Sequence, residues 1–132
     1  MVMGMIASSR RGPIVSIVDD DAGMRASLTD LLESVGCQSR CFDSSEQFLS
    51  CDAAQTSDIV ITDIQMGKLD GLGLLNHLRN TLGSSVPVIV ITALTDDELQ
   101  HRAAAEGCFA FLRKPFDPDM LLCHVKKAVA LP

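Results

Sequence analysis

The chain has 132 residues, of which 47% are hydrophobic and 21% charged, with a net charge of −6 at pH 7. These values are typical of one globular domain and exclude wholesale disorder. The negative charge argues against direct binding of nucleic acid phosphates, and no apolar run is long enough to span a membrane. We predict one domain at residues 13–132 after a flexible lead-in at residues 1–12. In the lead-in a basic pair follows an apolar stretch, whereas in a secretory signal the basic residues come first.

The first third of the chain is predicted to form two strands and two helices. The apolar run Ile14–Val18 predicts a strand, and apolar residues at helical spacing predict a helix over Ala22–Val35 that Gly36 ends. Cys37–Phe42 is consistent with an edge strand. The cap-forming run 43–46 then predicts a short helix.

The middle of the chain contains the most strongly apolar strand. Ile59–Asp63 is β-branched and apolar until it ends in an acid, which predicts a strand buried on both faces. After the loop 64–70, a helix is expected over Gly71–Leu82. Its predicted buried face consists of Leu72, Leu75, Leu78 and Leu82.

The last third is predicted to add two strands and two helices. A strand is expected at Val88–Thr92, and a helix at Asp96–Glu106 has only a thin apolar stripe, so little burial holds it in place. A fifth strand is expected at Cys108–Leu112, followed by a last helix that Asp117 caps.

Strands that alternate with helices through short connections indicate an α/β fold, a doubly wound parallel sheet with helices on both faces. In such a sheet the carboxyl ends of all strands lie at one edge. The acids that follow the first and third strands, the threonine that ends the fourth and the lysine after the fifth should therefore converge there. These residues are Asp19, Asp20, Asp63, Thr92 and Lys114.

Three carboxylates at one edge, Asp19, Asp20 and Asp63, would repel one another without a cation. Mg²⁺ suits two or three carboxylates and a backbone carbonyl from the loop after Asp63. With such an ion present, Asp63 could attack a phosphoryl group as a nucleophile. Lys114 and Thr92 would stabilise the phosphoryl oxygens.

Each of these residues also has a plainer interpretation. Acids at strand ends often cap helices, and Asp21 is the best candidate for that role. Thr92 alone would be an ordinary strand residue, and Lys114 alone a solvated charge. Phe111, on an alternating strand, is well explained by static packing in the core.

Five short motifs occur in order at the predicted strand ends: Val18-Asp19-Asp20, Asp63 with Met66, Asp70-Gly71, Thr92-Ala93 and Lys114-Pro115-Phe116. Together they resemble the receiver domain of two-component response regulators, over roughly residues 13–130, and Lys-Pro-Phe-Asp is similar to the nitrogen-fixation regulator branch. The resemblance implies a flavodoxin-like sheet of five strands in the order 2-1-3-4-5.

By position, the resemblance makes Asp63 the phosphoacceptor. Asp20 would bind Mg²⁺ directly, Asp19 through water, and Gln65 through its backbone carbonyl. Thr92 and Lys114 would contact the phosphoryl group, and Phe111 would be the aromatic switch residue that turns inward as Thr92 moves. The resemblance also implies a cis peptide bond between Lys114 and Pro115.

The implied function is a cytoplasmic signalling switch rather than a dedicated enzyme. A sensor histidine kinase or phosphotransfer protein would phosphorylate Asp63. The readout face, which would also make a homodimer contact, would consist of the helix after the fourth strand, the fifth strand and the last helix. Gly67 departs from the family pattern, which has proline there, and would make the loop more mobile. A degenerate receiver that only binds proteins is therefore one alternative.

A phosphohydrolase of the haloacid dehalogenase kind is a second alternative, since it shares a similar sheet and a nucleophilic aspartate. That class needs an acid two residues after the nucleophile, where this chain has Gln65. The five cysteines, odd in number and without C-x-x-C spacing, are expected to be reduced thiols, mostly packed as small hydrophobic residues.

Overall fold

The computed structural model describes residues 12–129. Five parallel strands form one sheet in the order β2-β1-β3-β4-β5, which confirms the predicted fold class and strand order. The strands are β1 (Ile14–Val18), β2 (Gln38–Phe42), β3 (Ile59–Asp63), β4 (Val88–Thr92) and β5 (Ala110–Arg113). The order reverses at β1, so the crevice at its carboxyl end lies between β1 and β3.

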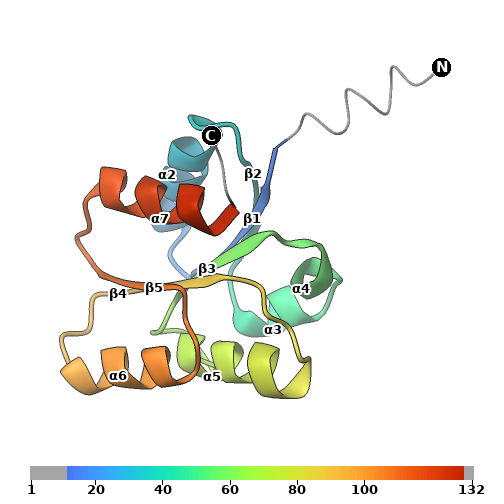
Figure 1. Ribbon diagram of the computed structural model, residues 1–132, viewed down its shortest axis with the longest axis vertical. Helices are drawn as coiled ribbons and strands as arrows, with labels where there is room; N and C mark the ends of the chain where they lie inside the picture. Colours follow the sequence, from blue (N-terminus) through green and yellow to red (C-terminus); the bar gives the residue numbers. More distant parts are fainter. Residues whose placement is uncertain (1–11, 130–132) are drawn as a thin grey trace.

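Helices cover both faces of this sheet (Figure 1). One face packs against α2 (Ala22–Glu33) and α7 (Pro118–Val129). The other packs against α3 (Ser45–Leu49), α4 (Ala53–Thr56), α5 (Gly71–Asn76) with the π-helix η1 (His77–Thr81), and α6 (Asp97–Ala105).

Two hydrophobic cores result, because side chains of a strand point alternately to the two faces. Ile17 of β1 and Ile61 of β3 belong to the core under α2 and α7, whereas Val18 and Val60 belong to the core under α3 to α6. All residues of β3 and β4 are buried, as expected for central parallel strands. The rigid central strands therefore place Asp63 and Thr92 at one edge.

The helix after β3 has nearly the predicted extent, but the expected burial of Leu82 is wrong. The α-helix ends at Asn76 and continues as a π-helix over His77–Thr81, and Leu82 beyond it is 42% exposed. A π-helix has more residues per turn than an α-helix, so it rotates the following residues away from the predicted face. Leu74, absent from that prediction, is fully buried, while Leu72, Leu75 and Leu78 are buried as predicted.

Other helices and strands begin or end a few residues away from their predicted bounds. The helix after β1 ends at Glu33, with Gly36 in the left-handed region at φ 86°, and β5 begins at Ala110 instead of Cys108. The structure also contains the one-turn α4, too short to leave a periodic pattern in the sequence.

The expectation that most cysteines are packed is also wrong. Cys37 is buried, but Cys41, Cys51 and Cys123 are exposed and Cys108 is half-buried. All five are free thiols, as expected.

The predicted lead-in lies outside the described residues except for Gly12. This residue has φ 81°, and a Cβ there would lie 2.1 Å from the Gly36 carbonyl oxygen, so Gly12 packs tightly against that turn. Between residues 12 and 129, no helix has the length and apolar character needed to cross a membrane.

Candidate functional site

Lys114 joins two carboxylates at the carboxyl edge of the sheet. Its Nζ donates to Asp63 Oδ2 at 2.8 Å and to Asp19 Oδ2 at 3.2 Å. The three residues are 51 and 95 positions apart along the chain, and the parallel sheet brings them together. The predicted convergence of Asp19, Asp63 and Lys114 is present in the structure.

The strand register explains how these groups meet. Asp63 at the end of β3 lies opposite Ile91 of β4, so Thr92 is one residue further toward the same edge. Thr92 in turn lies opposite Arg113 of β5, and its carbonyl accepts a hydrogen bond of 2.8 Å from the Lys114 N–H. The Lys114–Pro115 peptide bond is cis, as the resemblance implies.

Asp19 is held by the start of α2. Its Oδ1 accepts from the Asp21 N–H at 2.9 Å, and its carbonyl accepts from Arg25 Nη1 at 2.6 Å. Asp21 caps α2 by accepting from the Gly23 and Met24 N–H groups, which confirms the capping role predicted for it. The Asp19 side chain is only 1% exposed, so its carboxylate is fixed in position.

Asp63 is held by the loop that follows it. Its Oδ1 accepts from the Gln65 N–H at 3.0 Å, which leaves Oδ2 for Lys114. Glu46 of α3 accepts from the Leu69 N–H at 3.1 Å and so holds the later part of this loop in place. Gly71 packs directly on the loop, and its N–H donates to the Ile64 carbonyl at 3.0 Å.

Burial and the neighbouring opposite charge shift the pKa values of Asp19 and Lys114 in opposite directions. Burial raises the pKa of Asp19 above its ordinary value, and the Asp21 N–H and the Lys114 ammonium lower it without cancelling that effect. Burial by itself lowers the pKa of Lys114, but its contacts with Asp63 and Asp19 raise it by more, so the net pKa is raised. Burial dominates the pKa of Asp19 and the charge contacts dominate the pKa of Lys114, because Asp19 is almost fully buried whereas the Lys114 side chain is 17% exposed.

The buried charge of Asp19 leads to a prediction about stability. An acid whose pKa is raised on folding stabilises the fold below its unfolded pKa, and loses this contribution as pH rises through its folded pKa. Asp19→Asn should therefore raise the Tm of the metal-free protein at pH 7, measured by thermal melts in EDTA. The gain should vanish as pH falls below the ordinary value of 3.8.

Asp20→Asn is the matched control for this experiment, because Asp20 is exposed and its replacement should leave the metal-free Tm almost unchanged. A lower Tm for Asp19→Asn at pH 7 would contradict the prediction.

Thr92 lies next to this cluster at the end of β4, and Phe111 lies on the neighbouring strand β5. Thr92 is fully buried, and its Oγ1 accepts from the Leu94 N–H at 3.0 Å, so the hydroxyl hydrogen remains available to donate. Phe111 is half-buried on β5, opposite Val90, and packs against the core under α3 to α6.

Asp20 and Gln65 do not join the contact made by Lys114. Both are exposed, and only the backbone N–H of Gln65 contacts Asp63. Among residues 12–129, no three His, Cys, Asp or Glu side chains gather closely enough to hold a metal ion. Two carboxylates that share one cation nevertheless provide hard oxygen donors, which fit Mg²⁺ because this ion usually keeps several waters.

Three residues that support the site were not predicted as site residues from the sequence: Arg25, Glu46 and Gly71. Arg25 and Glu46 act through contacts with backbone groups, of Asp19 and of Leu69, and such contacts leave no spacing pattern in the sequence. The Asp70-Gly71 pair forms one of the five motifs, but the close approach of Gly71 to β3 depends on tertiary packing and leaves no pattern in the sequence.

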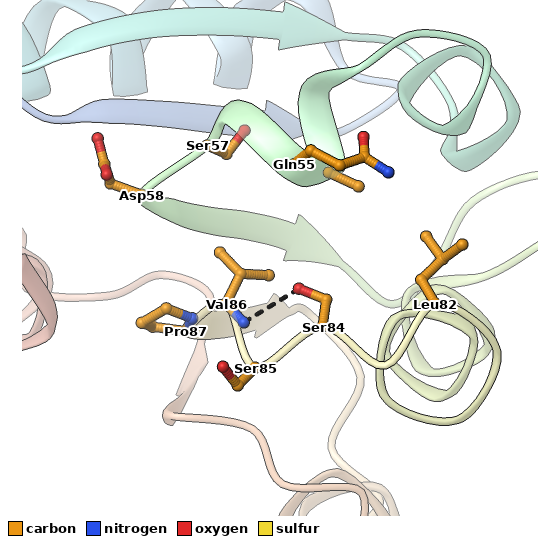
Figure 2. Close-up of a pocket in the computed structure, with 9 residues that line it drawn as sticks. Gln55, Ser57, Asp58, Leu82, Ser84, Ser85, Val86 and Pro87 are labelled. Atoms are coloured by element: carbon orange, nitrogen blue, oxygen red, sulfur yellow. Dashed lines mark hydrogen bonds between the residues drawn. The ribbon is translucent and has the colours of Figure 1, made fainter.

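A cavity of about 470 Å³ lies at the opposite edge of the sheet (Figure 2). Ser57 and Asp58 lead into β3 there, and the segment 84–87 leads into β4, with the Val86 N–H donating to Ser84 Oγ. Because this cavity lies at the amino ends of the strands, it does not belong to the site at Asp63.

The sheet order and the lysine-bridged acids define a flavodoxin-like domain with two carboxylates and one lysine at the carboxyl edge of its sheet. The chain matches the response regulator receiver domain over residues 15–126 and belongs to this family. It is 38% identical to the transcriptional regulatory protein TdiR of Thauera aromatica over 89% of this chain and 51% of that protein. The chain thus spans about half the length of this relative.

One further relative and one solved structure also support membership of this family. The transcriptional regulatory protein FixJ of Bradyrhizobium diazoefficiens is 34% identical over 87% of this chain and 56% of its own length, consistent with the expected branch. The receiver domain of the Francisella response regulator 1452 superposes with a TM-score of 0.83 at 27% identity, covering 90% of this chain and 98% of that one.

Proposed function

We propose that this chain is a phosphoaccepting receiver in which Asp63 takes a phosphoryl group from a histidine kinase or phosphotransfer protein. The observation that carries the proposal is the position of Lys114 Nζ, 2.8 Å from Asp63 and 3.2 Å from Asp19. An ammonium there can neutralise both the acid cluster and the oxygens of an incoming phosphoryl group.

In the proposed reaction, an Asp63 carboxylate oxygen attacks the phosphorus of the donor phosphohistidine. The O–P bond forms as the N–P bond breaks, and the electron pair of the broken bond stays on the histidine nitrogen. The Gln65 N–H orients the carboxylate, Lys114 binds a phosphoryl oxygen, and the Thr92 hydroxyl donates to another.

Mg²⁺ held by Asp19, Asp20, Asp63 and the Gln65 carbonyl would neutralise further phosphoryl charge. The convergence of Asp19 and Asp63 supports this ligand set, and Asp20, next to Asp19 in the chain, would complete it from its exposed position.

The protein donor would dock beside Lys114. A groove of about 300 Å³ between α2 and the start of α7 is lined mostly by apolar side chains and includes Lys114. Met24, Leu31 and Phe116 are among its lining residues, which suits a protein surface. The free thiols are consistent with our placing this reaction in the cytoplasm.

Phosphorylation would then switch the face formed by α6, β5 and α7, which we propose as the readout and dimer surface. The contacts of Thr92 support this step, since its Oγ1 accepts from the Leu94 N–H, and Leu94 and Phe111 pack against the same core under α3 to α6. The acyl phosphate would bias an equilibrium between two existing states.

Incubation with acetyl phosphate and Mg²⁺, followed by intact mass spectrometry, tests the proposal. We expect a stable, stoichiometric gain of one phosphoryl group. Multiple turnover without an adduct would indicate a phosphohydrolase, although Gln65 stands where that class needs an acid. No reaction at all would indicate a module that only binds proteins.

A further inference from the structure

Arg113, the last residue of β5, makes three contacts with its planar guanidinium group. Nη1 donates to the Leu94 carbonyl at 2.9 Å, and Nη2 donates to Asp97 Oδ1 at 3.0 Å. The guanidinium carbon also lies 5.7 Å from the centre of the Phe111 ring, within the range of a cation–π contact. One side chain thus connects β5 with the β4–α6 loop and the first turn of α6.

These contacts surround the residues that phosphorylation would move. Leu94 is bound on both sides, since its N–H donates to Thr92 Oγ1 at 3.0 Å and its carbonyl accepts from Arg113. A displacement of Thr92 and its loop toward Asp63 would stretch the bond between Leu94 and Arg113. It would also change the packing of Phe111 under the same guanidinium.

The helix that Arg113 holds has little else to anchor it. Of α6, only Ala103 is fully buried, with Leu99 partly buried. Polar contacts hold its two ends: Arg113 binds Asp97 at the amino end, and Glu106 accepts from Asn76 at 2.9 Å at the carboxyl end. A helix with so little apolar burial moves easily once such contacts are released.

The two hydrogen bonds of Arg113 differ in strength. The Asp97 side chain is 90% exposed, so its ion pair with Arg113 is screened by water and weak. The bond to the Leu94 carbonyl is partly buried and charge-assisted, and therefore stronger. The planar fork of arginine reaches both acceptors at once, which a lysine ammonium cannot do in the same geometry.

We propose that Arg113 is a positioning residue that restrains the β4–α6 loop and Phe111 in the arrangement seen here, and so opposes the switch to the phosphorylated state. This inference rests on the proposed phosphorylation of Asp63. Loss of the restraint raises the population of the switched state, and a ligand that prefers this state then binds more tightly.

Titration of the chain with beryllofluoride and Mg²⁺, a mimic of the phosphoryl group, tests this by calorimetry and by ¹⁹F NMR of the bound fluoride. Arg113→Ala should bind roughly five- to tenfold more tightly than the wild type, because one charge-assisted hydrogen bond no longer opposes the switch. Arg113→Lys should also bind more tightly. Asp97→Asn, an exposed change that spares the fold, should tighten binding by about twofold.

Two variants separate this role from general effects. Arg102→Ala removes a positive charge from an exposed position on α6, and should leave the beryllofluoride affinity unchanged. Glu106→Ala releases the carboxyl end of α6 but keeps the bond between Arg113 and Leu94, so it should lower the Tm and tighten beryllofluoride binding by less than Arg113→Ala does.

Equal or weaker binding by both Arg113 variants and Asp97→Asn would overturn the inference. If the wild type itself does not bind beryllofluoride, the proposed function fails first, which distinguishes the two failures.

Discussion

Asp63→Asn should abolish covalent phosphorylation by acetyl phosphate and leave the fold intact. Asparagine has the same shape as aspartate, so its Oδ1 can still accept one of the two hydrogen bonds that Asp63 receives from Gln65 and Lys114. The amide is a poor nucleophile, however, and cannot form the acyl phosphate. Intact mass spectrometry should detect no adduct under conditions that label the wild type fully.

Asp21→Asn is the matched control, since Asp21 belongs to the same acidic edge but only caps α2, and asparagine caps helices equally well. This variant should be labelled at the wild-type rate. Peptide mapping should place the wild-type phosphoryl group on Asp63. An adduct of undiminished amount in Asp63→Asn, or its location on another acid, would refute the assignment of the phosphoacceptor.

The central strands and the meeting of Asp19, Asp63 and Lys114 could be predicted because both depend on strong, local signals. Ile59–Asp63 has the predicted bounds, since a strand buried on both faces must be continuously apolar. Once the strands are parallel, the topology alone places residues after their carboxyl ends at one edge. No side-chain detail was needed to predict this contact.

The features that could not be predicted depend on tertiary packing. The π-helix at His77–Thr81 shifts the helical phase, and an α-helical pattern therefore places Leu82 on the wrong face. Asp20 and Asp19 are adjacent and chemically identical, yet only Asp19 turns toward Lys114. The contacts of Arg113 also leave no pattern in the sequence, because its acceptors lie 16 and 19 residues away and one of them is a backbone carbonyl.

Gly71→Ala should cause the largest loss of stability among single small substitutions near the site. A Cβ at Gly71 would lie 2.1 Å from the Asp63 carbonyl oxygen and 2.9 Å from the Ile64 Cα. Both are backbone atoms of the central strand and its loop, so no flexible side chain can move aside. We expect a loss of about 3 kcal/mol in the free energy of unfolding and a decrease of about 10 °C in Tm.

Gly67→Ala and Gly73→Ala are matched controls for this change. A Cβ at Gly67 meets nothing within 4 Å, so alanine there should be neutral or stabilise the fold by about 0.4–1 kcal/mol through the unfolded state. At Gly73 the nearest atom is Leu69 Cδ1 at 2.6 Å, the flexible end of a side chain, so the loss should be intermediate.

Phosphorylation of Gly71→Ala measured well below its Tm should also be slower than in both controls, because the strain displaces the backbone of the phosphoacceptor itself. Urea unfolding of the three variants gives the stability order directly. A Gly71→Ala protein as stable as Gly67→Ala would show that α5 can move away from β3 without cost, and that the contact between them does not position Asp63.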